Sequence, residues 1–282
     1  MKTPVKASIL KTALVASILG TAVSLAGDPV TTTTAPAPTI TEEESNFSGT
    51  LSLDVNSHFV SYGFDVWGDG NDLEGPTFNP AIELTWGLPA NFSLILGTWW
   101  DVNGKVPSAI GGKLQEIDVW AGLGYKVGDL SVTALYQNWI YGSANEQIVD
   151  LKFAYDTFLS PSLTIHNRVD PGASGGSNGT IVVAGVSHSI DAGPVSIAFP
   201  LNIAYFVDDD FHPASTDSGF GYGSIGINAT LPLTFLGDSA GEWNVHGGFT
   251  YYVTDSDVVA NSDAGRPDND FLTANIGIGC AF

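Results

Sequence analysis

The sequence predicts an all-β protein, a transmembrane antiparallel up-and-down β-barrel of about 12 strands. The first observation behind this prediction is an alternation of apolar and polar residues with a period of two, which recurs in one segment after another. The second is that the connections between these segments alternate between long and short. The third is that no comparable helical periodicity appears beyond the first 26 residues.

Twelve segments carry the alternation, and each is near the 9 to 11 or so residues that a tilted membrane-spanning strand needs. In the first segment, Leu51, Leu53 and Val55 share one face and Asp54 lies on the other. The predicted strands, in chain order, are 49–64, 77–87, 91–102, 115–126, 130–141, 146–157, 162–169, 179–190, 194–207, 220–231, 242–254 and 271–282.

Three of these segments need a separate comment. The phase of 179–190 is ambiguous. Pro200 lies inside the ninth segment, and because proline has no N–H to donate, we expect a bulge or a break there. The last segment alternates without error up to Phe282. Since open sheet edges are not tolerated in lipid, we expect it to pair with the first strand.

The connections indicate which kind of barrel this is. An outer-membrane barrel has short periplasmic turns and long outer loops, whereas a soluble sandwich has no reason to sort its loops in this way. The long connections follow the odd-numbered segments, with the four-residue GSAN as a short member: 65–76, 103–113, 142–145, 170–179, 208–219 and 255–270. The tight connections follow even-numbered segments: 88–90, 127–129, 158–161 and 191–193, with 232–242 longer than the rest.

Composition narrows the class further. The formal charge of −21 argues against nucleic-acid binding. Only 14% of residues are charged while 44% are hydrophobic, and soluble domains carry roughly a quarter charged residues. Beyond the first 26 residues no run reaches the 18 or so apolar residues of a membrane helix. The apolar surface must therefore face lipid from strands, or be buried as in a secreted soluble β-sandwich, the alternative reading.

The chain divides into three parts. Residues 1–26 combine a basic start, an apolar run and a small-x-small ending at Ala26, which predicts a signal peptide cleaved there and hence export. Residues 27–46 are rich in Thr, Pro, Ala and Glu and predict a disordered periplasmic linker. Residues 47–282 form the predicted outer-membrane barrel. The lone Cys280 lies on an apolar strand face and is read as a small hydrophobic residue.

Strand charges fall mostly opposite the apolar face, so we expect them to line the interior. Acidic side chains predominate there, which predicts a preference for cations. The basic residues could oppose the acidic ones across the pore or simply pair with them. The predicted pore-lining residues are Asp54, Glu83, Asp101, Glu116, Asp118, Lys126, Asp150, Lys152, Asp156, His166, Arg168 and His246. Inner-face glycines such as Gly248 and Gly277 predict a thinly covered wall.

No catalytic, cofactor or metal site is predicted. A lipid hydrolase would need Ser and His in hydrogen-bond reach, but Ser57–His58 and Ser187–His188 are adjacent and would point to opposite faces of a strand. The acidic loop 69–74 lacks the spacing of an EF-hand, and solvated loops are the favoured reading. A divalent ion bridging such loops to anionic lipid remains the alternative.

Three stretches resemble the hairpins of the TorF-type porin family: 58–86, 116–142 and 146–156. The first is similar to that family's opening hairpin, although Tyr62 precedes Gly63 where the family usually has Arg. The resemblance covers about half of the barrel and implies a channel or porin. Phe282 is similar to the C-terminal signal recognised by the barrel-assembly machinery, which implies that machinery as a partner alongside outer-membrane lipid and small solutes. An oligomeric state is not implied.

Overall fold

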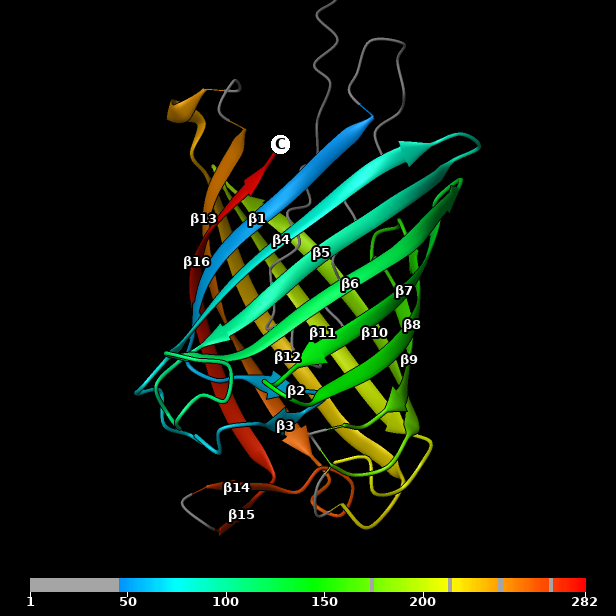
Figure 1. The fold of residues 1–282 in the computed structure, drawn as a ribbon. Helices are drawn as coiled ribbons and strands as arrows, with labels where there is room; N and C mark the ends of the chain where they lie inside the picture. The colour runs from blue at the N-terminus through cyan, green and yellow to red at the C-terminus, as the bar shows by residue number, and fades with distance from the viewer. Residues whose placement is uncertain (1–45, 173–174, 213–214, 238–240, 264–265) are drawn as a thin grey trace, which may run out of the picture.

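Twelve strands close into one antiparallel barrel in the structure, a computed structural model (Figure 1). The structure describes residues 46–282 except 173–174, 213–214, 238–240 and 264–265. The predicted signal peptide and all but the last residue of the predicted linker lie outside the described residues. Each strand pairs with its neighbours in the chain and the last pairs with the first, so the predicted fold class is confirmed.

The strands agree with the predicted segments to within a few residues, except at the first. The barrel strands are β1 (Phe47–Asn56), β4 (Thr77–Leu88), β5 (Phe92–Val102), β6 (Leu114–Val127), β7 (Leu130–Ile140), β8 (Asn145–Tyr155), β9 (Ser162–Asp170), β10 (Gly179–Ala192), β11 (Val195–Phe206), β12 (Gly219–Pro232), β13 (Glu242–Thr254) and β16 (Asp270–Ala281). Two small hairpins, β2 (Val60–Ser61) with β3 (Phe64–Asp65) and β14 (Asn261–Asp263) with β15 (Arg266–Asp268), lie at the long loops. A 3-10 turn, η1 (Thr234–Leu236), lies between β12 and β13.

The two ends of the barrel differ as the loop lengths predict. Short turns and the C-terminus are at the top of Figure 1, which we call the short-turn end. The long connections and both small hairpins are at the bottom, the long-loop end. Within the described residues no helix is long and apolar enough to cross a membrane.

The seam between first and last strands is closed by continuous pairing, from Thr50 opposite Ala281 to Asn56 opposite Asn275. Phe282 extends it through a pair of backbone hydrogen bonds with Gly49, of 2.7 and 3.0 Å. The Phe282 ring lies over Gly49, where a Cβ would come within 2.5 Å of it. The last residue is therefore part of the barrel seam.

Two details of the strands differ from expectation. The first strand ends at Asn56 rather than at residue 64, because residues 57–76, here called the inward loop, turn into the barrel. Pro200 does not break β11, although the ladder to β12 has no partners at Phe199 and Pro200. The register there resumes unchanged, and its shift comes later, between Ala204 and Tyr205.

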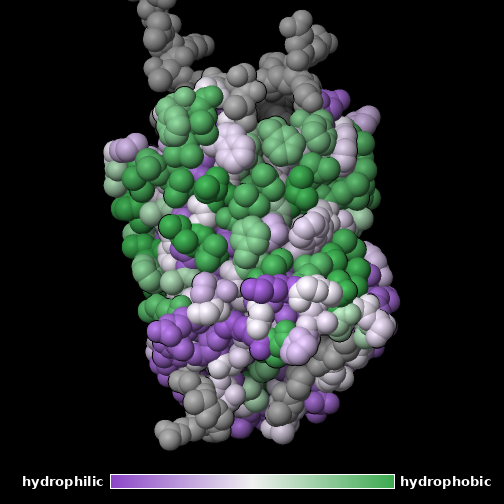
Figure 2. All heavy atoms as spheres, turned by 60° about the vertical axis from the view of Figure 1, so that its left-hand side comes forward, coloured by the Kyte–Doolittle hydropathy of each residue, from purple (hydrophilic) through white to green (hydrophobic). Residues whose placement is uncertain are grey.

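The outer face of the barrel is apolar. Side chains such as Leu123, Ile203, Ile225, Phe249 and Ile276 are exposed on it. Figure 2 shows hydrophobic residues gathered over the part toward the short-turn end and hydrophilic ones toward the long-loop end. This surface matches a barrel whose apolar band lies in lipid and whose long-loop end lies in water.

Several aromatic side chains near the strand ends point outward, as the aromatic girdles of a membrane barrel do. Phe92, Trp100, Tyr125 and Phe158 are exposed there. Tyr141, at the end of the predicted strand 130–141, instead points inward, and its hydroxyl donates to Glu146 Oε2 at 3.4 Å.

Candidate functional site: the barrel interior

The interior of the long-loop half is packed. Buried side chains of the wall and of the loops form a large apolar cluster, and a second, smaller cluster surrounds Trp99 and Phe59. The large cluster consists of Val60, Tyr62, Trp139, Ile148, Ile181, Val183, Ala204, Phe206, Phe211, Tyr222, Tyr252, Val258, Val259 and Phe271. Three loops contribute to it, so the long loops fold over and into the barrel mouth.

The inward loop reaches several walls of the barrel. Tyr62, which is 1% exposed, hydrogen-bonds through its hydroxyl to His166 on β9. The Phe59 ring packs on Trp99 of β5 at 5.2 Å between centroids, and the His58 ring stacks on Phe271 of β16 at 5.8 Å. The loop thus crosses the interior and constricts it at this level.

Most of the predicted pore-lining residues face the interior, where several form buried pairs. Arg168 Nε donates to Glu146 Oε1 at 2.5 Å, and its guanidinium lies 3.7 Å from the centre of the Phe211 ring. His166 Nδ1 lies 2.7 Å from Asp150 Oδ1. Of the two readings of the basic residues, pairing with acids therefore describes Arg168 and His166.

Asp150 is the centre of a small polar network. Besides His166 it accepts a hydrogen bond from Gln137 Nε2 at 2.6 Å, and Lys152 Nζ lies 3.5 Å away. Because Tyr62 joins the network through His166, it connects the inward loop to the β7–β9 wall. This arrangement holds the loop in place.

The inner-face glycines do not leave the wall bare, which corrects the expectation. Asp54 and His246 hydrogen-bond at 2.6 Å from the two strands flanking Gly277, and a Cβ on Gly277 would come within 1.9 Å of Asp54 Oδ1. Gly277 thus makes room for side chains from its two neighbouring strands to meet across it.

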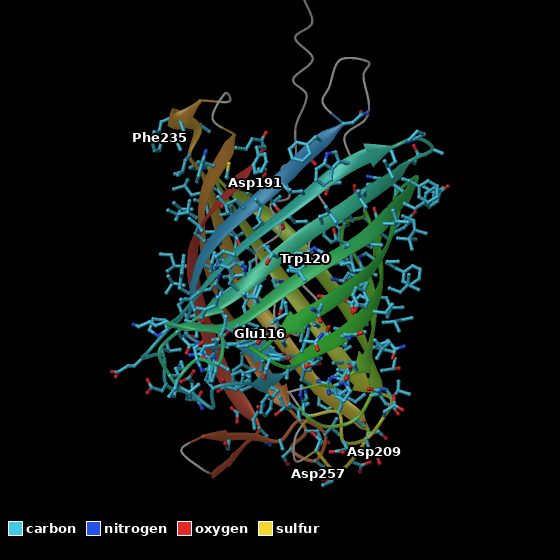
Figure 3. All side chains as sticks on the ribbon, in the orientation of Figure 1. Glu116, Trp120, Asp191, Asp209, Phe235 and Asp257 are labelled. Atoms are coloured by element: carbon cyan, nitrogen blue, oxygen red, sulfur yellow. The ribbon has the colours of Figure 1, made fainter. Side chains whose placement is uncertain are left out.

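Glu83 and Trp120 repeat this arrangement on another wall. Trp120 Nε1 donates to Glu83 Oε2 at 2.9 Å across Gly97, where a Cβ would lie 2.2 Å from the indole. Figure 3 shows Trp120 and Glu116 on the same strand, with Glu116 nearer the long-loop end. Lys126 continues the inner face of β6 toward the short-turn end and is half-buried.

A carboxylate group occupies the inner face of β5 and β6. Asp101 accepts hydrogen bonds from Asn79, Asn103 and Trp67. Glu116 lies directly opposite Asp101, and Asp118 follows two residues on. Neither Glu116 nor Asp118 has a basic partner among the described residues.

One predicted pore-lining residue is misplaced. β8 ends at Tyr155, so Asp156 lies exposed in the turn to β9, where its N–H donates to the carbonyl of Asp129. The predicted strand was two residues too long, and alternation carried through the turn placed Asp156 inside.

Several interior residues were not among those predicted from the sequence. Glu146 lies on the inner face of β8 in phase with Asp150, so the alternation could have found it. Tyr62, Asp65 and His212 belong to loops, and no sequence signal placed them inside. Burial, followed by the positive charge of Arg168, lowers the pKa of His212 to about 3. Burial has the opposite effect on an acid, and it raises the pKa of Asp65.

Ser57 and His58 do meet, contrary to expectation, because the chain has left the sheet at Asn56. Ser57 Oγ and His58 Nδ1 are 2.6 Å apart, and His58 Nε2 is 2.8 Å from the carbonyl oxygen of Gly70. Ser57 Oγ also accepts the Ala274 N–H at 2.8 Å, and both side chains are buried. These bonds fix the start of the inward loop to β16.

Among the described residues, no three Asp, Glu, His or Cys side chains are arranged to hold a metal ion.

Comparisons with known proteins add a fold likeness. No family model matches the chain, and no curated protein matches it. Similar solved structures include a KdgM porin in complex with disordered oligogalacturonate, at 8% identity and a TM-score of 0.42 over 83% of this chain and 99% of that one. A NanC porin matches at 10% identity and 0.43 over 82% and 98%. The translocator domain of the autotransporter NalP from Neisseria meningitidis matches at 10% and 0.41 over 83% and 87%. Likenesses this distant do not identify a function.

Proposed function

We propose that the chain is an outer-membrane channel for the passive diffusion of small hydrophilic solutes, with a preference for cations. The observation that carries the proposal is a closed barrel whose outer face is apolar and whose inner face holds the ionisable side chains. Such a surface pattern suits a barrel in lipid with a polar interior. No bond-making step is needed, and the proposal is of a channel and not an enzyme.

The preference for cations rests on the interior charges. In the described interior the acidic side chains are Asp54, Asp65, Glu83, Asp101, Glu116, Asp118, Glu146 and Asp150. The basic ones with fixed charge are Lys126, Lys152 and Arg168. Because acidic rings favour cations and repel anions, this excess supports cation passage.

Location and assembly are part of the same proposal. The chain would be exported by a signal peptide cleaved after Ala26. It would then be handed to the barrel-assembly machinery through Phe282 and inserted in outer-membrane lipid. The place of Phe282 in the seam over Gly49 supports this role. We expect Phe282→Ala to lower the amount of inserted barrel more than the conductance of each inserted molecule.

Conductance in planar bilayers tests the proposal. The purified barrel should give discrete conductance steps, and in a KCl gradient the reversal potential should have the sign for K⁺ over Cl⁻. An anion-selective reversal potential would contradict the cation preference. Absence of steps in the wild type and in a variant whose inward loop is shortened would contradict a channel altogether.

A second candidate function is a closed barrel with a structural role, and the inward loop is the observation that favours it. Tyr62, Phe59 and His58 contact the wall on β9, β5 and β16, so the described interior is crowded at that level. The shortened-loop variant separates the two candidates. A channel conducts more after shortening, whereas a structural barrel stays silent.

A further inference from the structure

Glu116 and Asp118 are adjacent on the inner face of β6, in the packed half of the barrel. In the strand register, Asp118 lies between Trp99 on β5 and Trp139 on β7. Glu116 lies opposite Asp101. The inward loop packs against this group, because Phe59 contacts Trp99 and Trp67 Nε1 donates to Asp101 Oδ2 at 3.1 Å. The two carboxyl groups are enclosed by aromatic rings and by the loop.

Three of their four carboxyl oxygens lack a hydrogen-bond partner. Asp118 is 1% exposed, and both of its carboxylate oxygens are buried without a hydrogen-bond partner. Glu116 is 3% exposed, and its Oε1 is also buried without a hydrogen-bond partner. The two carboxyl groups are within hydrogen-bonding reach of each other, yet two carboxylates have no proton to donate.

Several donors nearby have other acceptors, and the Tyr141 hydroxyl, which donates to Glu146 Oε2 at 3.4 Å, is also within reach of Glu116. Trp139 Nε1 donates to Gln137, and Arg168 donates to Glu146 and to the carbonyl of Phe211. Buried charge without compensation is strongly unfavourable, so the pair needs either a shared proton or a bound cation between its carboxyl groups. This requirement comes from the unpaired oxygens and not from the number of acidic residues.

We propose that Glu116 and Asp118 together bind a monovalent inorganic cation of the K⁺ and Na⁺ class. Two carboxylates can hold such an ion with its remaining waters, whereas a tight divalent centre would need a third ligand, which these described residues do not supply. A weakly held ion is also what a conduction path requires, because a site must release what it binds. The inference rests on the proposed channel, and it names the ion class and the position of its binding site.

Thermal unfolding of the detergent-solubilised barrel tests binding without any transport. The melting temperature should be higher in KCl than in choline chloride at equal ionic strength, because choline is too large for the pair. Glu116→Gln combined with Asp118→Asn should abolish that difference. The control, Asp129→Asn combined with Asp191→Asn, removes the same charge at exposed positions and should keep the difference.

A crystal soaked with Tl⁺, a heavy stand-in for K⁺, gives a second readout that needs no variant to fold. An anomalous peak between the two carboxylates supports the site, and its absence overturns the proposal. Equal melting temperatures in KCl and choline chloride, with stability that instead follows pH, would mean that the pair shares a proton and would also overturn it.

Bilayer recordings separate this inference from the channel itself. If the wild type is cation-selective and the Glu116→Gln/Asp118→Asn barrel loses selectivity, both stand. If the wild type is cation-selective and the variant is unchanged, the site is wrong and the channel stands. If the wild type does not conduct, the channel fails, and the melting and Tl⁺ experiments still decide the site.

Discussion

The two halves of the barrel interior are built differently. At the long-loop end, inner-face residues such as Asn79, Trp99, His166 and Phe206 are buried against one another and against the inward loop. At the short-turn end, the same strands present small polar side chains such as Thr85, which remain partly exposed. The long-loop half is thus packed like a protein core, whereas the inner wall of the short-turn half carries small polar side chains that stay partly exposed.

The difference shows where stability and selectivity are determined. Buried polar pairs depend on good partners, because removing one leaves the other unsatisfied. Small polar side chains in a wet interior lose little when altered. We therefore expect substitutions to have large effects in the long-loop half and small effects in the short-turn half.

The largest expected effect is at Gly277, beneath the Asp54–His246 hydrogen bond. In Gly277→Ala the new methyl group would overlap Asp54 Oδ1 and crowd His246 Nε2, separating the pair. Breaking a buried polar pair costs about 3–5 kcal/mol. Urea unfolding followed by tryptophan fluorescence should show a loss of this order. Gly223→Ala, where the nearest atom is 3.8 Å from the added Cβ, is the matched control and should unfold like the wild type.

Removal of the Tyr62 side chain should release the inward loop. Tyr62→Ala deletes the hydroxyl bonded to His166 and a ring whose centroid is 3.9 Å from that of the imidazole. Truncating a buried aromatic side chain costs about 3–5 kcal/mol of stability. Here the loss falls mainly on the contact between the inward loop and the barrel wall. Single-channel conductance should rise. Tyr205→Ala removes an outward-facing tyrosine and should leave conductance unchanged. A Tyr62→Ala barrel with wild-type conductance would mean that the loop is not the constriction.

The barrel itself could be predicted from the sequence because lipid outside and a different environment inside impose alternation on every strand. β5 was expected at 91–102 and is Phe92–Val102, and the other strands agree to a similar degree. The inward loop could not be predicted in this way. Residues 57–64 are also rich in apolar residues, but these change parity between Phe59 and Val60, and both of these side chains are buried inside the barrel.

The candidate site could be predicted only in part. Alternation placed Glu116 and Asp118 on the inner face correctly, since the face of a residue depends on its own strand. It could not show that Asp54 meets His246, because that contact depends on the register of two strands against β16. The prediction that Asp156 lines the interior was wrong because β8 ends at Tyr155. The end of a strand is set by its turn, which alternation does not detect.

Acid should weaken the long-loop half through His212. Since burial lowers the folded-state pKa of His212 from 6.5 to about 3, its stabilising contribution is complete above pH 6.5 and is lost as the pH falls toward 3. Arg168 and His166 also oppose its protonation, while a hydrogen bond to the Tyr62 backbone favours it. Aromatic rings pack around it from three residues: Phe64, Phe206 and Phe211.

The expected result is a melting temperature that falls between pH 6.5 and 3, with a smaller fall in His212→Gln. The effect of Asp65 on stability has the opposite dependence on pH. Because its folded-state pKa is raised, its stabilising contribution is present at low pH and is lost as the pH rises through that folded-state pKa. Asp65→Asn serves as the comparison and should make the acid-side fall steeper. Parallel pH profiles for wild type and His212→Gln would rule out His212 as the source.

The smallest effects should appear when one strand is probed in both halves. Asn79, on β4, accepts from Asn56 and Thr77 at 2.7 Å each and donates to Asp101 Oδ1 at 3.1 Å. Asn79→Ala leaves these groups unsatisfied and should cost about 1–3 kcal/mol. Thr85, six residues further along the same inner face, is partly exposed, and Thr85→Ala should change stability by at most about 0.5 kcal/mol. Urea unfolding of both variants measures the contrast on a single strand. Equal losses at the two positions would mean that the short-turn half is as tightly packed as the long-loop half, and that the interior is not divided as described.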